Sequence, residues 1–403
     1  MFKRLITLFS IPSYALLFLC MLLQGMGISL SVPFLSIYFT DQLGVSVSMF
    51  GVYLAVTLIA GVWISMLIGR RSDLGLNRKS IYLVSTLSTA IAYGGYLFIK
   101  DFTVLFIYMT VFTAFGAPGM PQLFAISREA VMKSTFTDHA FANSTLRSAF
   151  SLGFITGPLL GTLLIAAVGY KGIFSGTIGV FLLVALLIFL FLKSNTEQNN
   201  NHTDVTIQKF RLAQNRNILL PFIILLLMYI AHWTSSLNTA LFITNNIGGS
   251  TRDVGLVSSI CAALEIPFMI VLGLLSAKYS NRIIMLWGAI LGGAYYFVVI
   301  ISNSMWQMLG AQILLAIFVA VFSAIGISYI QDLLPSMPGY ASTLYSNSST
   351  IGRLIGSLVG GGLASIVGYR YSFVLCLILV SVSAILLVIS GRQSVEQGQK
   401  IAI

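Results

Sequence analysis

Apolar stretches of membrane-spanning length recur along the whole chain, and short polar connectors separate them. A helix that crosses the roughly 30 Å hydrocarbon core of a bilayer needs about 20 mainly apolar residues. Stretches of this kind precede and follow one polar segment, and they occupy residues 12–39, 48–69, 80–99, 103–128, 141–168, 172–192, 217–246, 254–275, 283–302, 304–332, 340–367 and 371–390. The pattern predicts an all-α integral membrane protein with twelve transmembrane helices in two six-helix bundles.

The central polar segment divides the chain into two halves. It contains the run Asn-Thr-Glu-Gln-Asn-Asn-Asn-His and cannot bury apolar area, so it is predicted to be a linker. The expected domains are an N-terminal bundle (1–192), a cytoplasmic linker (193–216) and a C-terminal bundle (217–403).

The composition excludes an ordinary soluble domain. Apolar residues make up 57% of the 403 residues and charged residues only 8%, whereas soluble proteins carry about 25% charged residues. The net charge of +11 is not concentrated in a nucleic-acid-binding patch, because most of the basic residues lie in short connectors. With the N-terminus inside, the outside connectors hold only Lys100, Lys171, Arg252 and Arg370. This positive-inside bias predicts a multi-pass protein of the cell membrane with both termini cytoplasmic.

An internal repeat supports the division into two halves. The fifth span of each half carries a GxxxGxxxG pattern followed by Gly-Tyr, in register at an offset of 199 residues. Glycines at every fourth position leave one helix face without side chains and allow close helix contact. The residues predicted to pack in this way are Gly153, Gly157, Pro158, Gly161, Gly352, Gly356 and Gly360. A seam between the two bundles is an alternative role for them.

Glu265 is the only acidic residue predicted to lie deep within a span. It falls about 16 Å from the start of its helix, near the middle of the bilayer. A charge at this depth is costly and usually functional. His232 and Arg353 are predicted at a similar depth, so proton coupling or substrate binding is assigned to Glu265, Arg353 and His232. A static pairing of Glu265 with either cation, or a simple helix-bridging hydrogen bond from His232, is the alternative.

A second group of charged residues lies at the predicted inner ends of the helices. Asp73 lies in a glycine-containing turn with Arg78, where it can cap a helix or bind a neighbouring arginine, and Glu129 and Arg147 could join it in a charge network. Arg282 and Asp332 are the weaker counterparts in the second half. The set is predicted to form an inner gate. Charges that only set topology are the alternative, because exposed ion pairs contribute little.

Neutral polar side chains occur inside several spans. Amides and tyrosines suit a polyhydroxylated ligand, because amides bond hydroxyl groups and aromatic rings stack on sugar C–H faces. The predicted substrate cavity comprises Gln24, Gln122, Asn238, Gln312 and Tyr329. Each of them could instead bridge two helices.

Recognisable catalytic and nucleotide-binding motifs are absent from the sequence. It lacks a Gly-x-x-x-x-Gly-Lys-Ser/Thr loop, His-Glu-x-x-His and Gly-x-Ser-x-Gly. Cys20, Cys261 and Cys376 all lie in apolar runs and suggest no metal site. We therefore expect no enzyme activity, no metal and no cofactor, with a proton gradient as the energy source.

Three segments and the overall pattern resemble a known family. The spans, the connector Gly69–Lys79 and the Gly157-Pro158-x-x-Gly161 segment resemble the major facilitator superfamily. The segments Met120–Glu129, Leu264–Pro267 and Gln331–Pro335 resemble its sugar efflux transporter family. The resemblance implies proton-driven export of sugars, with Glu265, Arg147 and the two inner networks at family-like positions. Arg353 is not expected from this resemblance.

The leading hypothesis is therefore a proton-coupled exporter of sugars or sugar-like compounds that works by alternating access, as a monomer in the lipid bilayer. A multidrug exporter of the same fold, an uptake transporter and a non-transporting sensor or scaffold are the alternatives. No nucleic-acid partner is expected.

Overall fold

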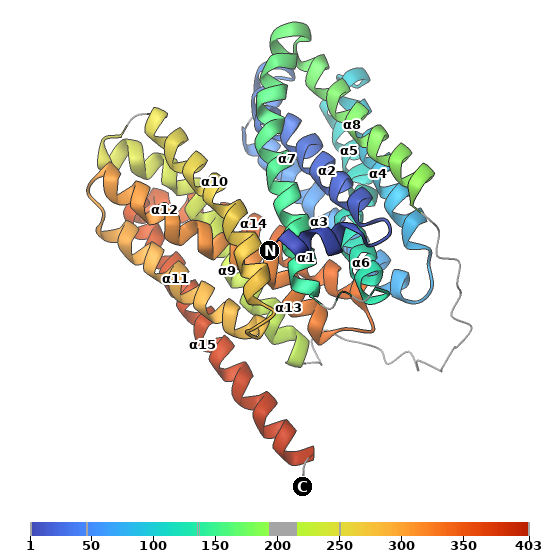
Figure 1. The fold of residues 1–403 in the computed structure, drawn as a ribbon. Helices are drawn as coiled ribbons and strands as arrows, with labels where there is room; N and C mark the ends of the chain where they lie inside the picture. The colour runs from blue at the N-terminus through green and yellow to red at the C-terminus, as the bar shows by residue number, and fades with distance from the viewer. Residues whose placement is uncertain are drawn as a thin grey trace. The chain divides into compact units, whose positions relative to one another are not determined.

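The computed structural model describes residues 2–45, 47–134, 136, 138–192, 216–249 and 251–401. The predicted linker 193–216 lies outside the described residues, except for the backbone of Arg216. All the regular structure within these ranges is helical, as predicted. Figure 1 shows the helices in chain order.

The described residues of the first half form eight helices and one π-helical turn. Their bounds are α1 Phe2–Phe9, α2 Tyr14–Ile37, η1 Tyr38–Gln42, α3 Val47–Asp73, α4 Arg78–Phe98, α5 Phe102–Gly116, α6 Gly119–Met132, α7 His139–Val168 and α8 Tyr170–Phe191. The predicted fourth span is divided between α5 and α6. The break falls at Pro118, where a proline has no N–H to continue the helical ladder.

In the second half, the described residues form seven helices and two π-helical turns. Their bounds are α9 Arg216–Phe242, η3 Ile243–Ile247, α10 Thr251–Leu275, α11 Asn281–Ile301, α12 Met305–Ala320, η4 Val321–Ile325, α13 Gly326–Leu333, α14 Pro338–Val367 and α15 Tyr369–Ile401. The predicted tenth span corresponds to α12, η4 and α13 together.

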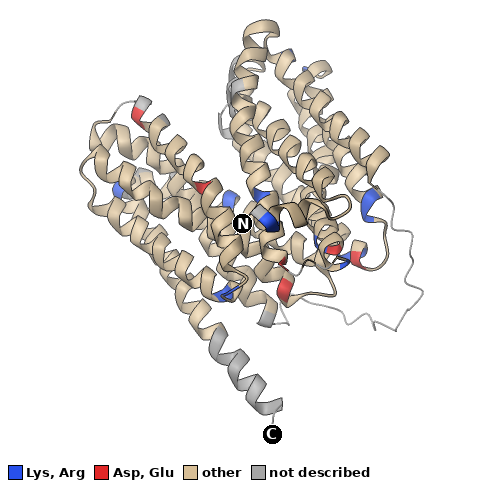
Figure 2. Ribbon diagram, in the orientation of Figure 1, with Lys and Arg blue, Asp and Glu red and all other residues tan. Residues whose placement is uncertain are grey.

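Eleven helical segments in the described ranges are long and apolar enough to cross a membrane. The remaining long helix is α14, which has 30 residues but begins with a polar half rich in serine, threonine and asparagine. Figure 2 shows long uncharged stretches of ribbon, with charged residues gathered mainly near helix ends. Eleven of the twelve predicted spans are therefore matched by such segments, and α14 lies at the position of the other one.

Contacts between helices divide the chain into two compact units. Unit 1 comprises residues 1–200 together with 336–347, and unit 2 comprises 201–335 and 348–403. The first residues of α14 thus belong to unit 1, although they lie in the second half of the sequence. This division differs from a simple cut at the linker.

Unit 1 has a core rich in aromatic rings. The ring of Tyr96 stacks on Phe174 at a centroid distance of 4.6 Å, and its hydroxyl lies 2.8 Å from that of Tyr53. These side chains come from α4, α8 and α3, so they join three spans. In unit 2, Phe322 contacts Tyr229 at 4.7 Å and Phe318 at 4.9 Å.

Candidate functional site

The glycines of the repeat pack each fifth-span helix against the first-span helix of its own half. In unit 1, a Cβ atom at Gly157 would lie 2.8 Å from the backbone of Leu30 in α2. Gly153 and Gly161 face α2 in the same way. Such distances leave no room for a side chain, so α7 and α2 meet backbone to backbone.

The same arrangement recurs in unit 2. A Cβ atom at Gly356 would lie 2.7 Å from the carbonyl oxygen of Ile230 in α9, and Gly352 and Gly360 also face α9. Thr234 of α9 donates to the carbonyl oxygen of Gly356 at 3.0 Å. The glycine faces thus lie within each unit. Pro158 lies inside α7, which continues through it to Val168.

A charged and polar cluster joins the ends of α3, α4 and α6, and we call it the Arg78 cluster. It consists of Ser72, Asp73, Arg78, Gln122 and Glu129. Arg78 donates to Asp73 at 2.5 Å, to Glu129 at 2.6 Å and to the Ser72 hydroxyl at 3.0 Å. The side chain of Asp73 is only 1% exposed and that of Arg78 10%, so water screens this ion pair weakly.

The Arg78 cluster also holds the first turn of α14. Asp73 accepts the backbone N–H of Gly339 at 2.9 Å and that of Tyr340 at 2.6 Å. The first N–H groups of a helix have no partner within the helix, and they favour a negative charge nearby. Asp73 therefore caps a helix from a distant part of the sequence. Gly339 is required at this point, because a Cβ atom there would lie 2.9 Å from an Asp73 oxygen.

Sequence reasoning missed the N–H groups of Gly339 and Tyr340 as partners of Asp73. The signal that could have revealed them is Pro338, because proline is favoured at the first position of a helix. That position predicts free N–H donors in the two residues that follow.

Two predicted residues occupy places that differ from the expectation. Arg147 does not join the Arg78 cluster: its guanidinium lies 4.7 Å from the ring centroid of Phe150, and no ion pair of Arg147 occurs with any described residue. Gln122, predicted in a substrate cavity, instead donates to Ser72 at 3.1 Å.

In unit 2, the predicted inner group of Arg282 and Asp332 includes a hydrogen bond to Asp332 from the side-chain amide of Asn281. Asn281, which begins α11, donates to the carboxylate of Asp332 at 2.7 Å. The hydroxyl of Tyr329 lies near Ser390 and Arg282. Tyr329 is therefore close to this inner group.

The other predicted cavity residues are buried against neighbouring helices. Asn238 donates to the carbonyl oxygen of Gly360 and to the hydroxyl of Ser372, both at 3.1 Å. Gln312 donates to the carbonyl oxygen of Met308 in its own helix at 2.9 Å. Gln24 accepts a long hydrogen bond of 3.5 Å from Tyr82. Asn238 thus bridges helices, which is the alternative that the sequence left open.

The three residues predicted near the bilayer centre all belong to unit 2. Glu265 is half-buried in α10, one turn after Cys261. The ring of His232 packs against Trp233 at 5.5 Å and Phe322 at 5.3 Å. The guanidinium of Arg353 lies over Trp233, 5.6 Å from the ring centroid. Arg353 therefore contacts an aromatic ring and does not form the static pair with Glu265 that the sequence left open.

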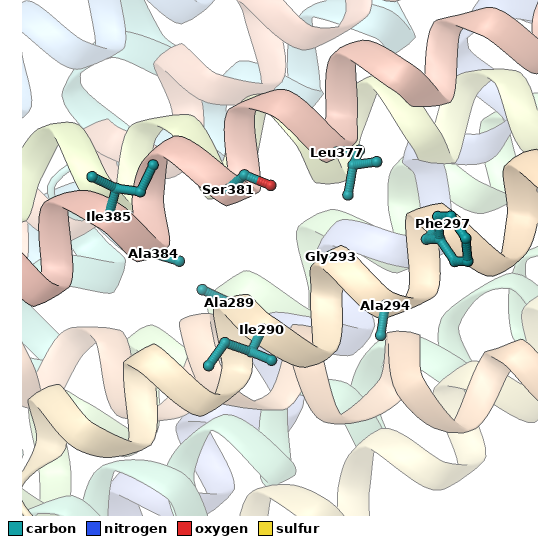
Figure 3. Close-up of a pocket in the computed structure, with 9 residues that line it drawn as sticks. All are labelled: Ala289, Ile290, Gly293, Ala294, Phe297, Leu377, Ser381, Ala384 and Ile385. Atoms are coloured by element: carbon teal, nitrogen blue, oxygen red, sulfur yellow. The ribbon is translucent and has the colours of Figure 1, made fainter.

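An open groove in unit 2 contains none of the predicted residues. It has a volume of about 410 Å³ and lies between α11 and α15, with Gly293 and Ser381 among small and apolar side chains (Figure 3). Its rim residues Phe297 and Ile385 are exposed and belong to membrane-spanning segments. Lipid tails are their natural surroundings, so the groove is not a candidate substrate site.

Comparison with known proteins identifies the family. The family model described as Major Facilitator Superfamily matches residues 17–237 and 221–401. The chain belongs to the Major Facilitator Superfamily. It is therefore a multi-pass membrane transporter, as the resemblance of its sequence implied, and its family is not one of enzymes.

The relatives within this superfamily include named sugar exporters. Sugar efflux transporter A of Dickeya chrysanthemi is 28% identical over 363 residues, which cover 90% of this chain and 92% of that protein. Sugar efflux transporter C of Escherichia coli is 28% identical over 369 residues, covering 91% and 92%. The resemblance of the sequence to the Major Facilitator Superfamily is confirmed, and these relatives show its similarity to sugar efflux transporters.

Solved structures agree on the fold. The crystal structure of the Escherichia coli transporter FucP in its outward conformation matches with a TM-score of 0.75 at 14% identity, covering 94% of this chain and 98% of that chain. An identity this low supports the fold alone. The predicted all-α membrane fold is thereby confirmed.

Proposed function

We propose that this transporter exports sugars or sugar-like compounds across the cell membrane in exchange for protons, with both termini cytoplasmic. The observation that carries the proposal is the similarity to named sugar efflux transporters over nine tenths of the chain. A monomer is the proposed transporting form.

Glu265 is the proposed proton-coupling residue. A carboxyl group in the middle of a span is costly when charged, so its protonation changes the energy of its surroundings. A proton can drive the cycle only if it binds one conformation more tightly than the other. Glu265 supplies a carboxylate that can take up and release a proton for this purpose.

The Arg78 cluster is the proposed inner gate. Its hydrogen bonds to the first turn of α14 are short and shielded, so they favour the conformation in which they are present. Alternating access requires a competing conformation in which they are broken. Substrate and proton binding would supply the free energy difference between the two conformations.

Transport in membrane vesicles tests the proposal. Inside-out vesicles that contain the protein are placed in a medium with a radiolabelled disaccharide. A proton gradient is then imposed, with the interior of the vesicles acidic. We expect sugar uptake that collapses when a protonophore is added, and no uptake into vesicles without the protein. Gradient-driven uptake of a lipophilic cationic dye with no uptake of sugar would favour a multidrug exporter instead. Sugar uptake that ignores the gradient would reject proton coupling.

A further inference from the structure

Arg353 has no acidic partner within the described part of the chain. Its guanidinium lies 5.6 Å from the ring centroid of Trp233, and that aromatic contact is the interaction that the structure gives it. The ion pairs of the described residues involve Arg4 and Arg78, not Arg353. A guanidinium stays protonated under physiological conditions. Among the described residues of unit 2, the helix α14 therefore carries a positive charge that no acidic side chain balances.

The aromatic ring compensates the charge only in part. A ring face attracts a cation but offers no lone pair to its N–H groups. Arg353 keeps five N–H donors in a planar fork that matches a carboxylate or a phosphate. Charged side chains inside membranes almost always have partners, so the missing partner of Arg353 is expected to come from outside the chain.

Trp233 supplies a second unused donor beside Arg353. Its indole nitrogen Nε1 is buried and has no hydrogen-bond partner among the described groups. The indole N–H can only donate. The ring is held by its contact with His232 at 5.5 Å. Arg353 and Trp233 thus present donors from two adjacent helices, and both require an acceptor.

The close crossing of α9 and α14 places these two residues together. Gly356 lies one turn after Arg353, and a Cβ atom there would lie 3.0 Å from the Cβ of Trp233. A larger residue at position 356 would push the helices apart. The glycine face described above therefore also sets the separation between Arg353 and Trp233.

Arg370, in the same unit, differs from Arg353 because its N–H groups have hydrogen-bond acceptors within the protein. Its guanidinium also lies over a ring, 5.2 Å from the centroid of Phe242. It nevertheless donates to the carbonyl oxygen of Ile300 at 2.7 Å and to Asn303 at 3.0 Å. Arg370 has found acceptors within the protein, which makes it a suitable control.

We propose that Arg353 and Trp233 form a carboxylate-binding subsite, and that the exported substrate is a sugar that carries one negative charge, such as a hexuronate. The inference rests on the proposed function and specifies its substrate class. One guanidinium balances one carboxylate. A phosphate monoester carries a charge of about −1.5 to −2 at pH 7, so a single arginine would leave it undercompensated.

Counterflow in proteoliposomes tests the subsite without a proton gradient. The full-length protein is reconstituted, and exchange of radiolabelled glucuronate is compared with exchange of radiolabelled glucose. We expect faster exchange of glucuronate, competition by unlabelled glucuronate, and weaker competition by its methyl ester and by glucose 6-phosphate. Arg353→Gln should lower the ratio of glucuronate to glucose exchange by about tenfold or more, because a charged hydrogen bond is lost.

Three further variants sharpen this comparison. Arg353→Lys keeps the charge but loses the fork, and it should give an intermediate ratio. Trp233→Phe keeps the ring and removes the N–H donor, so the ratio should fall less than in Arg353→Gln. Arg370→Gln should leave the ratio unchanged. If Arg353→Gln does not fold, the Lys and Phe variants carry the test.

Two results would overturn the subsite and leave the proposed function in place. One is exchange of glucose without any exchange of glucuronate, and the other is an equal loss of both in the Arg353 and Trp233 variants. A preference for glucose 6-phosphate over glucuronate would reject the single-charge argument. Failure of the folded protein to exchange any sugar would instead reject the proposed function, and the subsite with it.

Discussion

The carboxylate of Asp73 accepts the backbone N–H of Tyr340 at 2.6 Å, although 267 residues separate them in the sequence. One acid thereby joins the end of α3 to the start of α14. The same carboxylate binds Arg78 and the N–H of Gly339. Asp73 thus accepts hydrogen bonds from three donors, and each donor would lose its acceptor if the carboxylate were removed.

Asp73→Asn should destabilise the protein. The amide is neutral and keeps one acceptor oxygen. Arg78 therefore loses its ion pair with residue 73, and one backbone N–H at the start of α14 loses its acceptor. We expect a loss of about 1–3 kcal/mol, seen as a lower midpoint of thermal unfolding in detergent. Asp101→Asn is the control, because Asp101 caps α5 at its exposed start and asparagine caps equally well. Equal midpoints for the two variants would contradict the role given to Asp73.

Gly339→Ala should loosen the same attachment without removing a charge. The new Cβ would lie 2.9 Å from an Asp73 oxygen and would also overlap Arg78 and Ser72. We expect lower thermal stability and faster deuterium uptake at the start of α14. Gly310→Ala provides the matched control, since nothing lies within 4 Å of its Cβ position. If the two alanine variants take up deuterium at the start of α14 at the same rate, the Arg78 cluster does not hold this turn.

Gly157→Ala should weaken the packing of α7 against α2. The methyl group would lie 2.8 Å from backbone atoms of Met26 and Leu30, and overpacking of this kind costs about 1–3 kcal/mol. Gly179→Ala in α8 faces open space and should be neutral or stabilising, because alanine favours helices over glycine. Thermal unfolding of both variants measures the difference. A stabilised Gly157→Ala variant would disprove close contact of the two helices.

Glu265→Gln should uncouple sugar movement from the proton gradient. Glutamine is close in size but does not titrate near neutral pH, so a proton can no longer shift the conformational equilibrium at this position. We expect gradient-driven export to be lost while sugar counterflow partly remains. Asp253→Asn, at the start of the same helix, should keep its coupling. Undiminished gradient-driven export by Glu265→Gln would remove this residue from the mechanism.

Hydropathy located the spans well because a bilayer imposes a length and a composition on every crossing helix. Length and composition do not determine how each helix is rotated about its axis, and this rotation decides which neighbours a side chain contacts. Gln122 illustrates the problem: its depth suited a cavity, but its amide points to Ser72. Spacing could not distinguish these two directions.

Charge pairing was predictable only where the sequence limits the choices. Asp73 and Arg78 flank one tight turn, so binding to a neighbouring arginine was one of the two roles open to Asp73, beside capping a helix. Glu265 had two possible partners at a similar depth, Arg353 and His232, and only the structure shows that Arg353 lies over Trp233. An aromatic ring competes for a cation, and a search limited to acids does not consider it.

Residues 336–347 belong to unit 1 although they lie beyond the central linker, so the two halves of the chain depend on each other. A chain divided at the central linker would separate Asp73 from the N–H groups that it accepts, because these lie on the downstream fragment. The upstream fragment alone would leave a buried carboxylate with fewer donors. Independent synthesis of the two pieces would therefore require their reassociation before the first piece could complete its own interior.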